Sequence, residues 1–464
     1  MKLYNTLSRK IEDFIPNEEG KVKFYTCGPT VYSDAHIGNI RSYIGHDILD
    51  KTLRYIGYDV TRIMNITDVG HLTSDSDYGD DKMVESAKKE NKNVMDIAGY
   101  YTDRFFIDFD LVNNKVPEIV SPATSHIDDY IKIITKLIEK GYAYESGGNI
   151  YFDTSKLTEY YQLTNHKEEE MLIGAREGVD KDSNKKNQAD FVLWFTKSKF
   201  DSQELKWESP WGMGYPGWHI ECSGICIHHG GEYIDIHGGG VDNIFPHHTN
   251  EIAQSEAYLG HKWCNYWFHN EHLMDETGKM SKSDGATLTV SKLKEKGYDP
   301  LSYRFMCLNS HYRKQLVFNY TISNSSEQTY KKLKNRISLI KDDGELDEDA
   351  FAFYNKKFIT HLEADLNTAN AMTLIYDLLK NELINGHTKL ELIKSFDKVL
   401  SLDLLKKEEL REDHDDIIAL IKSRNNAKKR KDFELADSIR DELSEKGIVL
   451  LDTREGTTYK VVGE

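Results

Sequence analysis

The side chains best suited to chemistry gather in one stretch of the chain, between positions 218 and 251. It contains, in order, Trp218-His219-Ile220-Glu221-Cys222, His237-Gly238-Gly239-Gly240 and Pro246-His247-His248-Thr249-Asn250-Glu251. Pro246 is typical of the first position of a helix, so His247 and Glu251 should lie one turn apart on the same helix face. Together with Cys222, about 25 residues upstream, they are three candidate ligands of a zinc ion.

A fourth ligand would have to come from a distant part of the sequence, and Cys27 is the best placed. It follows the strand-like run Lys21–Thr26. The alternative is structural, because a cysteine at a strand end is more often a small buried hydrophobe. A histidine and a glutamate one turn apart are likewise more often part of an exposed helix face. Since the chain has no CxxC pair, spacing alone favours the structural alternative.

Two further segments could bind a ligand. Gly238, Gly239 and Gly240 follow a strand expected at Tyr233–His237, and they would let a ligand approach the backbone closely. The pattern matches neither GxGxxG nor a Walker loop, so a tight turn is an equal alternative. Lys279 and Lys282 lie in a polar segment bracketed by glycines. That segment is either a mobile surface loop or an arm that brings ammonium groups onto a polyphosphate.

The elements that would position these residues begin with a βαβ unit. Strands are expected at Lys21–Thr26 and Asp59–Ile66, with a helix between them that Gly57 ends. This order predicts a parallel sheet, whose ligands bind at the carboxyl ends of the strands, where Cys27 and Thr67 fall.

The chain from 112 to 207 then resembles an insertion into the sheet, which resumes near Trp218. Ser121-Pro122 should start a helix that Gly141 ends, and a hairpin should turn around Ser146-Gly147-Gly148. The charged segment from Lys167 to Gln188 is expected to be an exposed loop.

The last third of the chain has a helical pattern. Helices are expected near 323–341, 350–363, 367–385, 388–403 and 414–446, followed by a hairpin over 448–462 that turns at Glu455-Gly456. Near the end of the chain, six basic residues crowd into ten positions with no acidic residue among them: Lys422, Arg424, Lys428, Lys429, Arg430 and Lys431. Such a run is usually just a solvated face, but it can also bind nucleic acid.

Composition sets broad limits. The 464 residues are enough for about three domains, with 39% hydrophobic and 30% charged residues. No apolar run approaches a membrane span, and the N-terminus lacks the apolar core of a signal peptide, so we expect a cytoplasmic protein. Five dispersed cysteines fit a reducing compartment. The net charge of −17 argues against a polyanionic partner, unless a local basic patch provides the contact.

Two motifs in combination identify a family. His36-Ile37-Gly38-Asn39 and Lys279-Met280-Ser281-Lys282-Ser283 resemble the two signatures of the class I aminoacyl-tRNA synthetases. The segments around Cys222, His237 and His247 are similar to the cysteine-specific family within that class. The resemblance covers essentially the whole chain. It implies an α/β protein with a Rossmann-like parallel-sheet catalytic domain, split by an insertion and followed by a mainly α-helical tRNA-binding region.

The resemblance also implies domain limits. We expect the first half of the catalytic domain at 1–111, an inserted connective domain at 112–207, and the second half with the lysine loop at 208–310. A helical bundle at 311–405 and an anticodon-binding region at 406–464 would follow.

The implied activity is ligation of L-cysteine to tRNA(Cys) with ATP, by a monomer that binds one Zn²⁺ per chain and uses Mg²⁺ with ATP. The implied zinc ligands are Cys27, Cys222, His247 and Glu251. The implied ATP and catalytic residues are His36, Asn39, Lys279 and Lys282, with Gly238, Gly239 and Gly240 along the adenosine. Thr67, Trp218 and Asp242 would bind the amino acid, and the six basic residues would bind tRNA.

One residue departs from the family pattern, because Asn39 stands where the first signature usually ends in a second histidine. Asparagine can donate a hydrogen bond but cannot carry charge. Two other functions stay open on the sequence. One is a cysteine-activating ligase with an amino-sugar acceptor, which would lack the full C-terminal half. The other is a non-catalytic RNA-binding protein with a structural zinc.

Overall fold

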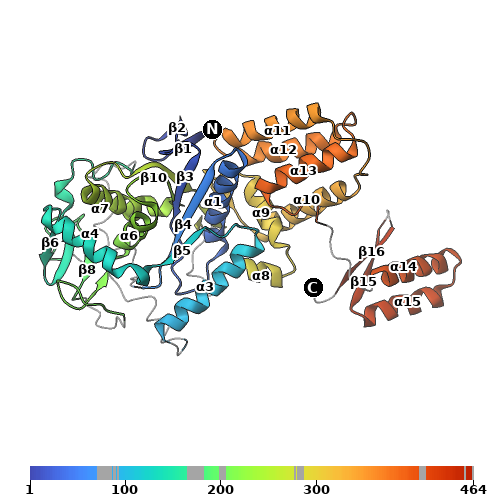
Figure 1. Ribbon diagram of the computed structural model, residues 1–464. Helices are drawn as coiled ribbons and strands as arrows, with labels where there is room; N and C mark the ends of the chain where they lie inside the picture. The colour runs from blue at the N-terminus through green and yellow to red at the C-terminus, as the bar shows by residue number, and fades with distance from the viewer. Residues whose placement is uncertain are drawn as a thin grey trace. The chain divides into compact units, whose positions relative to one another are not determined.

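The computed structural model describes residues 1–69, 86, 90, 93–164, 182–197, 205–275, 278–279, 287–406, 414–453 and 456–461 (Figure 1). The chain forms two compact units, one of Met1–Lys294 with Asp299–Leu404 and one of Glu295–Tyr298 with Leu405–Glu464. The finer division into five parts remains a prediction.

A five-stranded parallel sheet forms the centre of the larger unit. Its strand order is β11-β10-β3-β4-β5. The strands are β3 (Lys21–Thr26), β4 (Asp59–Ile66), β5 (Ile119–Pro122), β10 (Ile234–Gly240) and β11 (Cys264–Asn270). The chain therefore builds outward from β3 in one direction with β4 and β5, and in the other with β10 and β11. Ligands of such sheets bind where the order reverses, which here is between β3 and β10.

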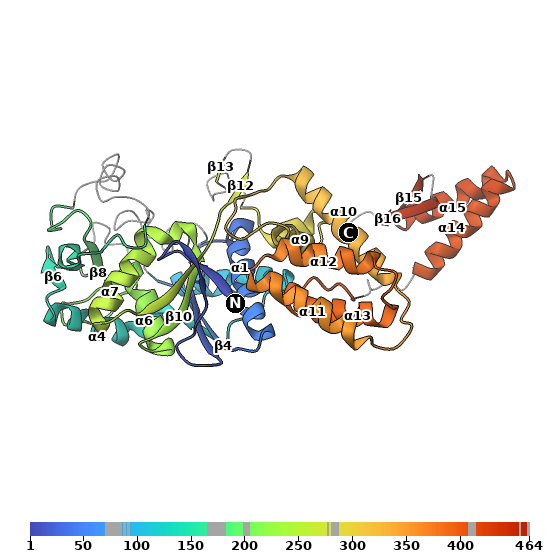
Figure 2. The ribbon, with the colours of Figure 1, turned by 90° about the horizontal axis from the view of Figure 1, so that it is seen from above.

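Helices cover both faces of this sheet (Figures 1 and 2). One face carries α1 (Ile37–Tyr55), against which α3 (Val94–Leu111) packs. The other carries α4 (Ile127–Glu139), α6 (Trp218–Gly230) and α7 (Thr249–Leu259). Because side chains alternate along a strand, Phe24 lies near His46 of α1, whereas Tyr25 joins the core of α4, α6 and α7. Strands buried on both faces explain the apolar runs in β3 and β4.

The segment between β5 and α6 adds a second, antiparallel sheet in the order β6-β7-β8-β9. Its strands are β6 (Ala143–Ser146), β7 (Asn149–Phe152), β8 (Phe191–Phe195) and β9 (Tyr215–Pro216). The predicted hairpin is confirmed. The predicted helix start was wrong: Ser121 and Pro122 end strand β5, and a 3₁₀ turn, η1 (Ala123–His126), leads into α4. Proline is tolerated there because β5 lies at the edge of the sheet.

The remaining elements of the larger unit are short strands and the helices of its C-terminal half. The strands are β1 (Lys2–Asn5), β2 (Lys10–Asp13), β12 (Leu273–Asp275), β13 (Gly278–Lys279) and β14 (Leu316–Val317). The helices are α8 (Val290–Glu295), α9 (Pro300–Leu308), α10 (Tyr320–Ser338), α11 (Glu348–Glu363), α12 (Thr368–Lys380) and α13 (Gly386–Leu400). α10 to α13 confirm the helical pattern of the sequence. Among the helices of the described residues, none is both long and apolar enough to cross a bilayer.

The smaller unit pairs two helices with a hairpin. These are α14 (His414–Lys429), α15 (Phe433–Glu445), β15 (Ile448–Thr453) and β16 (Gly456–Val461). The pairing of β15 with β16 confirms the hairpin, although Glu455 of its predicted turn lies outside the described residues. The single helix expected over 414–446 is broken in two. Lys431 adopts a left-handed backbone conformation with φ of 61°, and Asp432 caps α15 by accepting from the Leu435 N–H. Ile417, Ile421, Ile439, Leu443 and Ile448 form its own small core.

Candidate metal and amino-acid site

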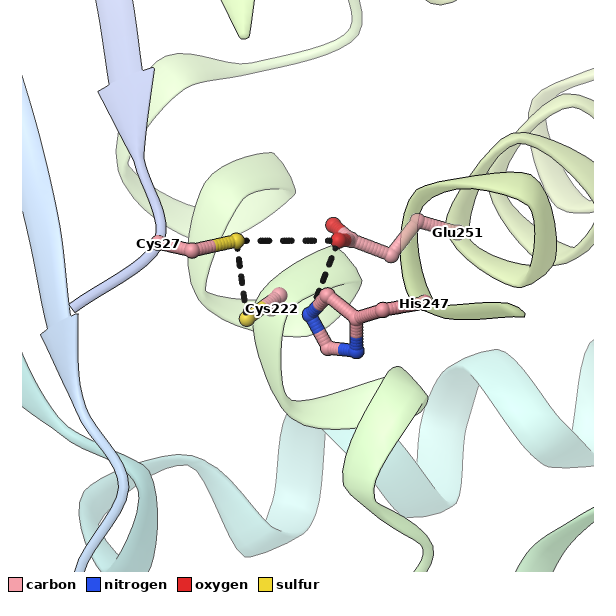
Figure 3. Close-up of side chains that lie close together, drawn as sticks. All are labelled: Cys27, Cys222, His247 and Glu251. Carbon is pink, nitrogen blue, oxygen red and sulfur yellow. Dashed lines mark hydrogen bonds and ion pairs between the residues drawn. The ribbon is translucent and has the colours of Figure 1, made fainter. Parts of the chain in front are cut away.

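Four side chains from three places in the sequence converge at the reversal point of the sheet (Figure 3). Cys27 directly follows β3 and Cys222 lies on α6. His247 lies in η4 (Ile244–His248), the turn before α7, and Glu251 lies in the first turn of α7. The two sulfur atoms are 3.9 Å apart, Cys27 Sγ lies 3.9 Å from Glu251 Oε1, and His247 Nε2 lies 3.1 Å from the same oxygen. One ligand atom from each of the four lies within 4.8 Å of the others. The spacing of these atoms suits a shared cation.

The backbone that presents His247 enters its helix through a kink at Phe245. Pro246 follows a cis peptide bond and belongs to η4 (Ile244–His248), a π-helical turn in which Phe245 has an extended conformation. The regular helix α7 begins only at Thr249. Phe245 is the only residue of η4 with a non-helical backbone, so helical backbone runs from Pro246 into α7 and agrees with the predicted helix start. His247 and Glu251 face each other as expected.

The electrostatics of the four residues favour a positive charge among them. Burial alone would lower the pKa of His247, but the charges of Glu251 and Cys222 raise it to about 10. Burial alone would raise the pKa of Glu251, but His237 and His247 lower it to about 2. Burial alone would also raise the pKa of Cys222. The hydrogen bond from Cys27 and the charge of His247 outweigh it and lower this pKa to about 6.

Two anionic groups thus hold a proton on His247, and a divalent cation can take over that role. His247 Nε2 is buried and makes no well-formed hydrogen bond in spite of its closeness to Glu251. A buried nitrogen that lacks a good partner is what a metal ligand looks like without its ion. Two sulfurs, an imidazole and a carboxylate are ligand types that zinc accepts.

A layer of histidines surrounds the cluster, and the sequence did not predict that they would contact it. His219 Nδ1 lies 3.0 Å from His247 Nδ1, and His237 Nε2 lies 2.9 Å from Glu251 Oε2. His248 Nε2 lies 3.3 Å from Cys27 Sγ, so Cys27, His237, His248 and Glu251 form a second overlapping set of possible ligands. Such partners fix the orientation of metal ligands. Each histidine is visible in the quoted motifs, but only the fold shows which atoms it contacts.

Of the predicted amino-acid contacts, Trp218 lies against the cluster, whereas Thr67 and Asp242 lie just beyond the carboxyl ends of β4 and β10. The Trp218 ring stacks on His247, with centroids 4.2 Å apart. Thr67 follows β4 and is buried, and its hydroxyl accepts from Asn65 Nδ2 at 3.0 Å. Asp242 lies just beyond β10, with its carboxylate 3.4 Å from His272 Nε2, and is more than half exposed. The sheet therefore brings Thr67 and Asp242 to one edge, the carboxyl ends of its strands.

The three glycines are part of strand β10 rather than a loop after it. A Cβ at Gly239 would meet the His248 ring at 2.6 Å, and one at Gly238 would lie 3.0 Å from the Phe24 ring. Packing therefore explains these two glycines. At Gly240 the nearest atom would be 3.6 Å away, so protein contacts do not require glycine there.

The first signature caps helix α1. His36 is the N-cap residue: its ring accepts from the Asn39 N–H at 3.2 Å, and the Asn39 side chain accepts from the His36 N–H at 3.2 Å. This reciprocal capping box gives Asn39 a structural task that asparagine performs well. It also leaves the helix N-terminus, with its partial positive charge, at the carboxyl edge of the sheet.

Of the basic residues predicted to bind phosphate or tRNA, all but Lys282 lie within the described residues. Lys279 belongs to the short strand β13, paired with Met274, whereas Lys282 and most of the 167–188 segment lie outside the described residues. Near the end of α14, Lys422, Lys428, Lys429, Arg430 and Lys431 are exposed. Arg424 is only 6% exposed, so burial does not favour it as an RNA contact.

Comparison with known proteins adds independent evidence. The family model described as tRNA synthetases class I (C) catalytic domain matches residues 13–328. The chain is 45% identical to the cysteine--tRNA ligase of Treponema denticola and 42% identical to that of Borreliella burgdorferi, each over 99% of both chains. It is also 40% identical to that of Zymomonas mobilis, over 97% of this chain and 95% of the relative.

A solved structure agrees on the fold. The methionyl-tRNA synthetase of Mycobacterium tuberculosis in complex with methionyl-adenylate matches with a TM-score of 0.55 and 15% identity. The match covers 82% of this chain and 91% of that one. At this identity the likeness concerns the architecture alone.

Proposed function

The chain belongs to the cysteine--tRNA ligases of the class I synthetases, and from this premise we propose how its residues join L-cysteine to tRNA(Cys). The cysteine carboxylate attacks the α-phosphorus of ATP, which forms cysteinyl-adenylate and releases pyrophosphate. A terminal ribose hydroxyl of the tRNA then attacks the cysteinyl carbonyl and releases AMP. The observation that carries the proposal is the convergence of Cys27, Cys222, His247 and Glu251 beside Trp218 at the ligand-binding edge of the sheet.

Recognition of cysteine would depend on these four residues as zinc ligands. Serine has almost the shape of cysteine, and a pocket that reads shape alone separates such pairs by about 10²-fold. Zinc, when bound, supplies a preference for a soft thiolate over a neutral hydroxyl. The histidine layer supports this role by holding His247 and Glu251 in place. Trp218 would close one side of the pocket, and Thr67 and Asp242 would orient the rest of the amino acid.

ATP would bind at the N-terminus of α1. Phosphoryl transfer needs positioning and charge neutralisation more than covalent help from the protein. The positive N-terminal end of α1 and the side chains of His36 and Asn39 would hold the triphosphate with Mg²⁺. Lys279 and Lys282 would neutralise the departing pyrophosphate, and Gly240 would lie beside the adenosine.

The smaller unit would bind the tRNA. Its exposed lysines and arginine at the end of α14 form a local positive surface on an acidic protein. We expect a monomeric, cytoplasmic enzyme, since tRNA charging serves translation there. The amino-sugar ligase and the non-catalytic protein are not favoured, because the identity to cysteine--tRNA ligases extends over 99% of the chain.

The test has two parts. Cysteine-dependent exchange of labelled pyrophosphate into ATP should occur with zinc and magnesium present, and its absence would contradict adenylate formation. Charging of tRNA that carries the cysteine anticodon should follow. Exchange without charging would favour another acceptor, whereas equal charging with serine would contradict the role given to the zinc ligands.

A further inference from the structure

Three histidines gather at the C-terminal end of α6, away from the site already described. His228 and His229 lie in its last turn, and His126 ends η1, just before α4. The three rings contact one another, with centroid separations of 4.7 Å for His126 and His228, 5.1 Å for His126 and His229, and 4.7 Å for His228 and His229. No step of the proposed reaction uses them.

One carboxylate orients two of these rings. Asp129 Oδ2 lies 3.0 Å from His126 Nδ1 and 2.9 Å from His228 Nδ1. When both Nδ1 atoms donate to this oxygen, the Nε2 atoms of the two rings carry lone pairs. A carboxylate that accepts from the far nitrogen of an imidazole is the usual support of a metal-bound histidine, because it fixes the tautomer and raises the basicity of the ligating nitrogen.

Ser121 completes the cluster from the end of β5. Its hydroxyl oxygen lies 2.7 Å from His126 Nε2 and 3.1 Å from His229 Nε2. A hydroxyl can rotate away at little cost, so this contact does not commit the nitrogens permanently. Burial and the neighbouring histidines lower the pKa of His229, which keeps its ring neutral and able to ligate at physiological pH.

The positions of the nitrogens suit a single ion. Each histidine can offer one ring nitrogen so that the three lie within 4.8 Å of one another. Nitrogens bound to one tetrahedral zinc are about 3.3 Å apart, from Zn–N bonds of about 2.0–2.1 Å. Small rotations of the side chains would close this difference. His126 is 6% exposed and would anchor the site, whereas His228, with 47% of its side chain exposed, would leave it open to solvent.

We propose that His126, His228 and His229 form a second metal site, which takes a borderline divalent transition ion such as Zn²⁺. Three imidazoles suit zinc and leave a fourth position for water. His228 is six residues beyond Cys222 on α6, about 9 Å along the helix, so the two sites are separate. An ion there would tie the end of α6 to η1 and the start of α4, elements that pack against the side of the sheet that carries the first cluster.

The test compares bound zinc in matched variants of the full chain. His228→Gln keeps an amide that can donate to Asp129 but removes the ligating nitrogen. His387→Gln is the control, since His387 is another partly exposed histidine that contacts a carboxylate, 2.7 Å from Asp342. After equilibrium dialysis against low micromolar Zn²⁺, metal analysis should find two zinc ions per chain in the wild-type protein and in His387→Gln, but one in His228→Gln.

Two further measurements decide the remaining cases. Cys222→Ala should keep the second ion while losing the first, and His228→Gln should keep its cysteine-dependent pyrophosphate exchange, which shows that it is folded. With Co²⁺ in place of Zn²⁺, the ion lost in His228→Gln should lack the sulfur-to-metal absorption of a cysteine-bound ion. One zinc per wild-type chain, or two in His228→Gln, would overturn the proposal and leave the cluster a hydrogen-bonded link.

Discussion

At the scale of single residues, the candidate metal cluster shows how four weak signals support one another once the fold is known. Spacing alone favoured a structural reading of Cys27, Cys222, His247 and Glu251. The fold places their ligand atoms within 4.8 Å and lets their charges raise the pKa of His247 to about 10. The site depends on contacts between residues about 220 positions apart in the chain, such as Cys27 and Glu251, which no local pattern can reveal.

The first prediction uses two cysteines on the same helix. Cys222→Ala and Cys226→Ala make the same change at two buried positions of α6, but only Cys222 belongs to the cluster. Cys222→Ala should lower kcat/KM for cysteine in pyrophosphate exchange by at least about 10²-fold, because loss of even an outer partner of a metal ligand costs 10–100-fold. The KM for ATP should stay nearly unchanged.

The control variant, Cys226→Ala, separates loss of the metal from loss of stability. Cys226→Ala also removes a buried thiol from α6, so it should change stability to a similar extent. The bound zinc and the kinetic constants for cysteine should be retained. An equal loss of cysteine and ATP binding in Cys222→Ala would contradict a role in reading the substrate and point to a structural metal.

At the scale of elements, the capping box of α1 gives a second prediction. Asn39 accepts from the His36 N–H, and its amide also remains a donor that a phosphate can use. Asn39→Asp keeps the acceptor and places a carboxylate in the first turn, where the helix favours it. We expect the midpoint of thermal unfolding to stay the same but the KM for ATP to rise by about tenfold, equivalent to about 1.4 kcal/mol of lost binding.

Asn39→Ala separates the two tasks further. It removes both the Asn39 half of the capping box and the donor, so it should also lower stability by about 0.5–1 kcal/mol. If Asn39→Asp binds ATP as well as the wild-type protein does, Asn39 is only a cap, and its assignment to the triphosphate fails.

The elements themselves were predictable where the pattern is local and regular. β3 and β4 appear as predicted because their runs of apolar residues are buried on both sides, and α1 follows its helical repeat. The errors arose where one local rule met a stronger constraint. Ser121-Pro122 completes an edge strand, and Lys431 breaks a helix that periodicity extends across it.

A buried ion pair links helices that lie far apart in the sequence, and no pattern predicted it. Arg304 of α9 contacts Asp47 Oδ2 of α1 at 2.6 Å, and its other nitrogens donate to the carbonyls of Leu400 and Val112 at 2.6 and 3.0 Å. Both charged side chains are fully buried. Burial lowers the pKa of Lys51, a second neighbour of Asp47, to about 8, so Arg304 is the more permanent partner.

The third prediction concerns the stability of this junction and its dependence on pH. Asp47→Asn should lower the free energy of unfolding by about 3–5 kcal/mol, because it leaves a buried guanidinium without its countercharge. Burial would raise the pKa of Asp47, but Arg304 and Lys51 outweigh it and hold that pKa below its usual value of 3.8. The ionised carboxylate therefore stabilises the fold fully above pH 3.8 and loses this effect as the pH falls through its lower, folded-state pKa.

Urea unfolding of the wild-type and Asp47→Asn proteins checks both statements. The difference between them should be constant from pH 7 to about pH 5 and should shrink only at lower pH. Glu18→Gln is the control, since it breaks an ion pair with Lys21 that is more than half exposed on both sides, and it should leave stability unchanged. A difference that grows as the pH falls would contradict the assigned direction of the pKa shift.

At the scale of the whole molecule, net charge and function point in opposite directions. A chain with a net charge of −17 repels RNA on average, so binding must depend on where its positive charges lie. The smaller unit has its own apolar core and carries five exposed basic side chains between Lys422 and Lys431. Composition could predict neither this core nor the burial of Arg424, because both follow from how α14, α15 and the hairpin pack.

The fourth prediction tests this surface through salt. Replacement of Lys428, Lys429 and Arg430 by alanine should weaken tRNA binding and make the slope of log K against log [salt] shallower by about 2 to 3, since each lost phosphate contact contributes about 0.7 to 0.9. Pyrophosphate exchange should not change, because it does not involve tRNA. The control removes the same charge from exposed positions of the larger unit, Lys10, Lys21 and Lys132, and should leave the slope as it is. An unchanged slope in the first variant would mean that these side chains only solvate the helix end, and that tRNA binds to another part of the chain.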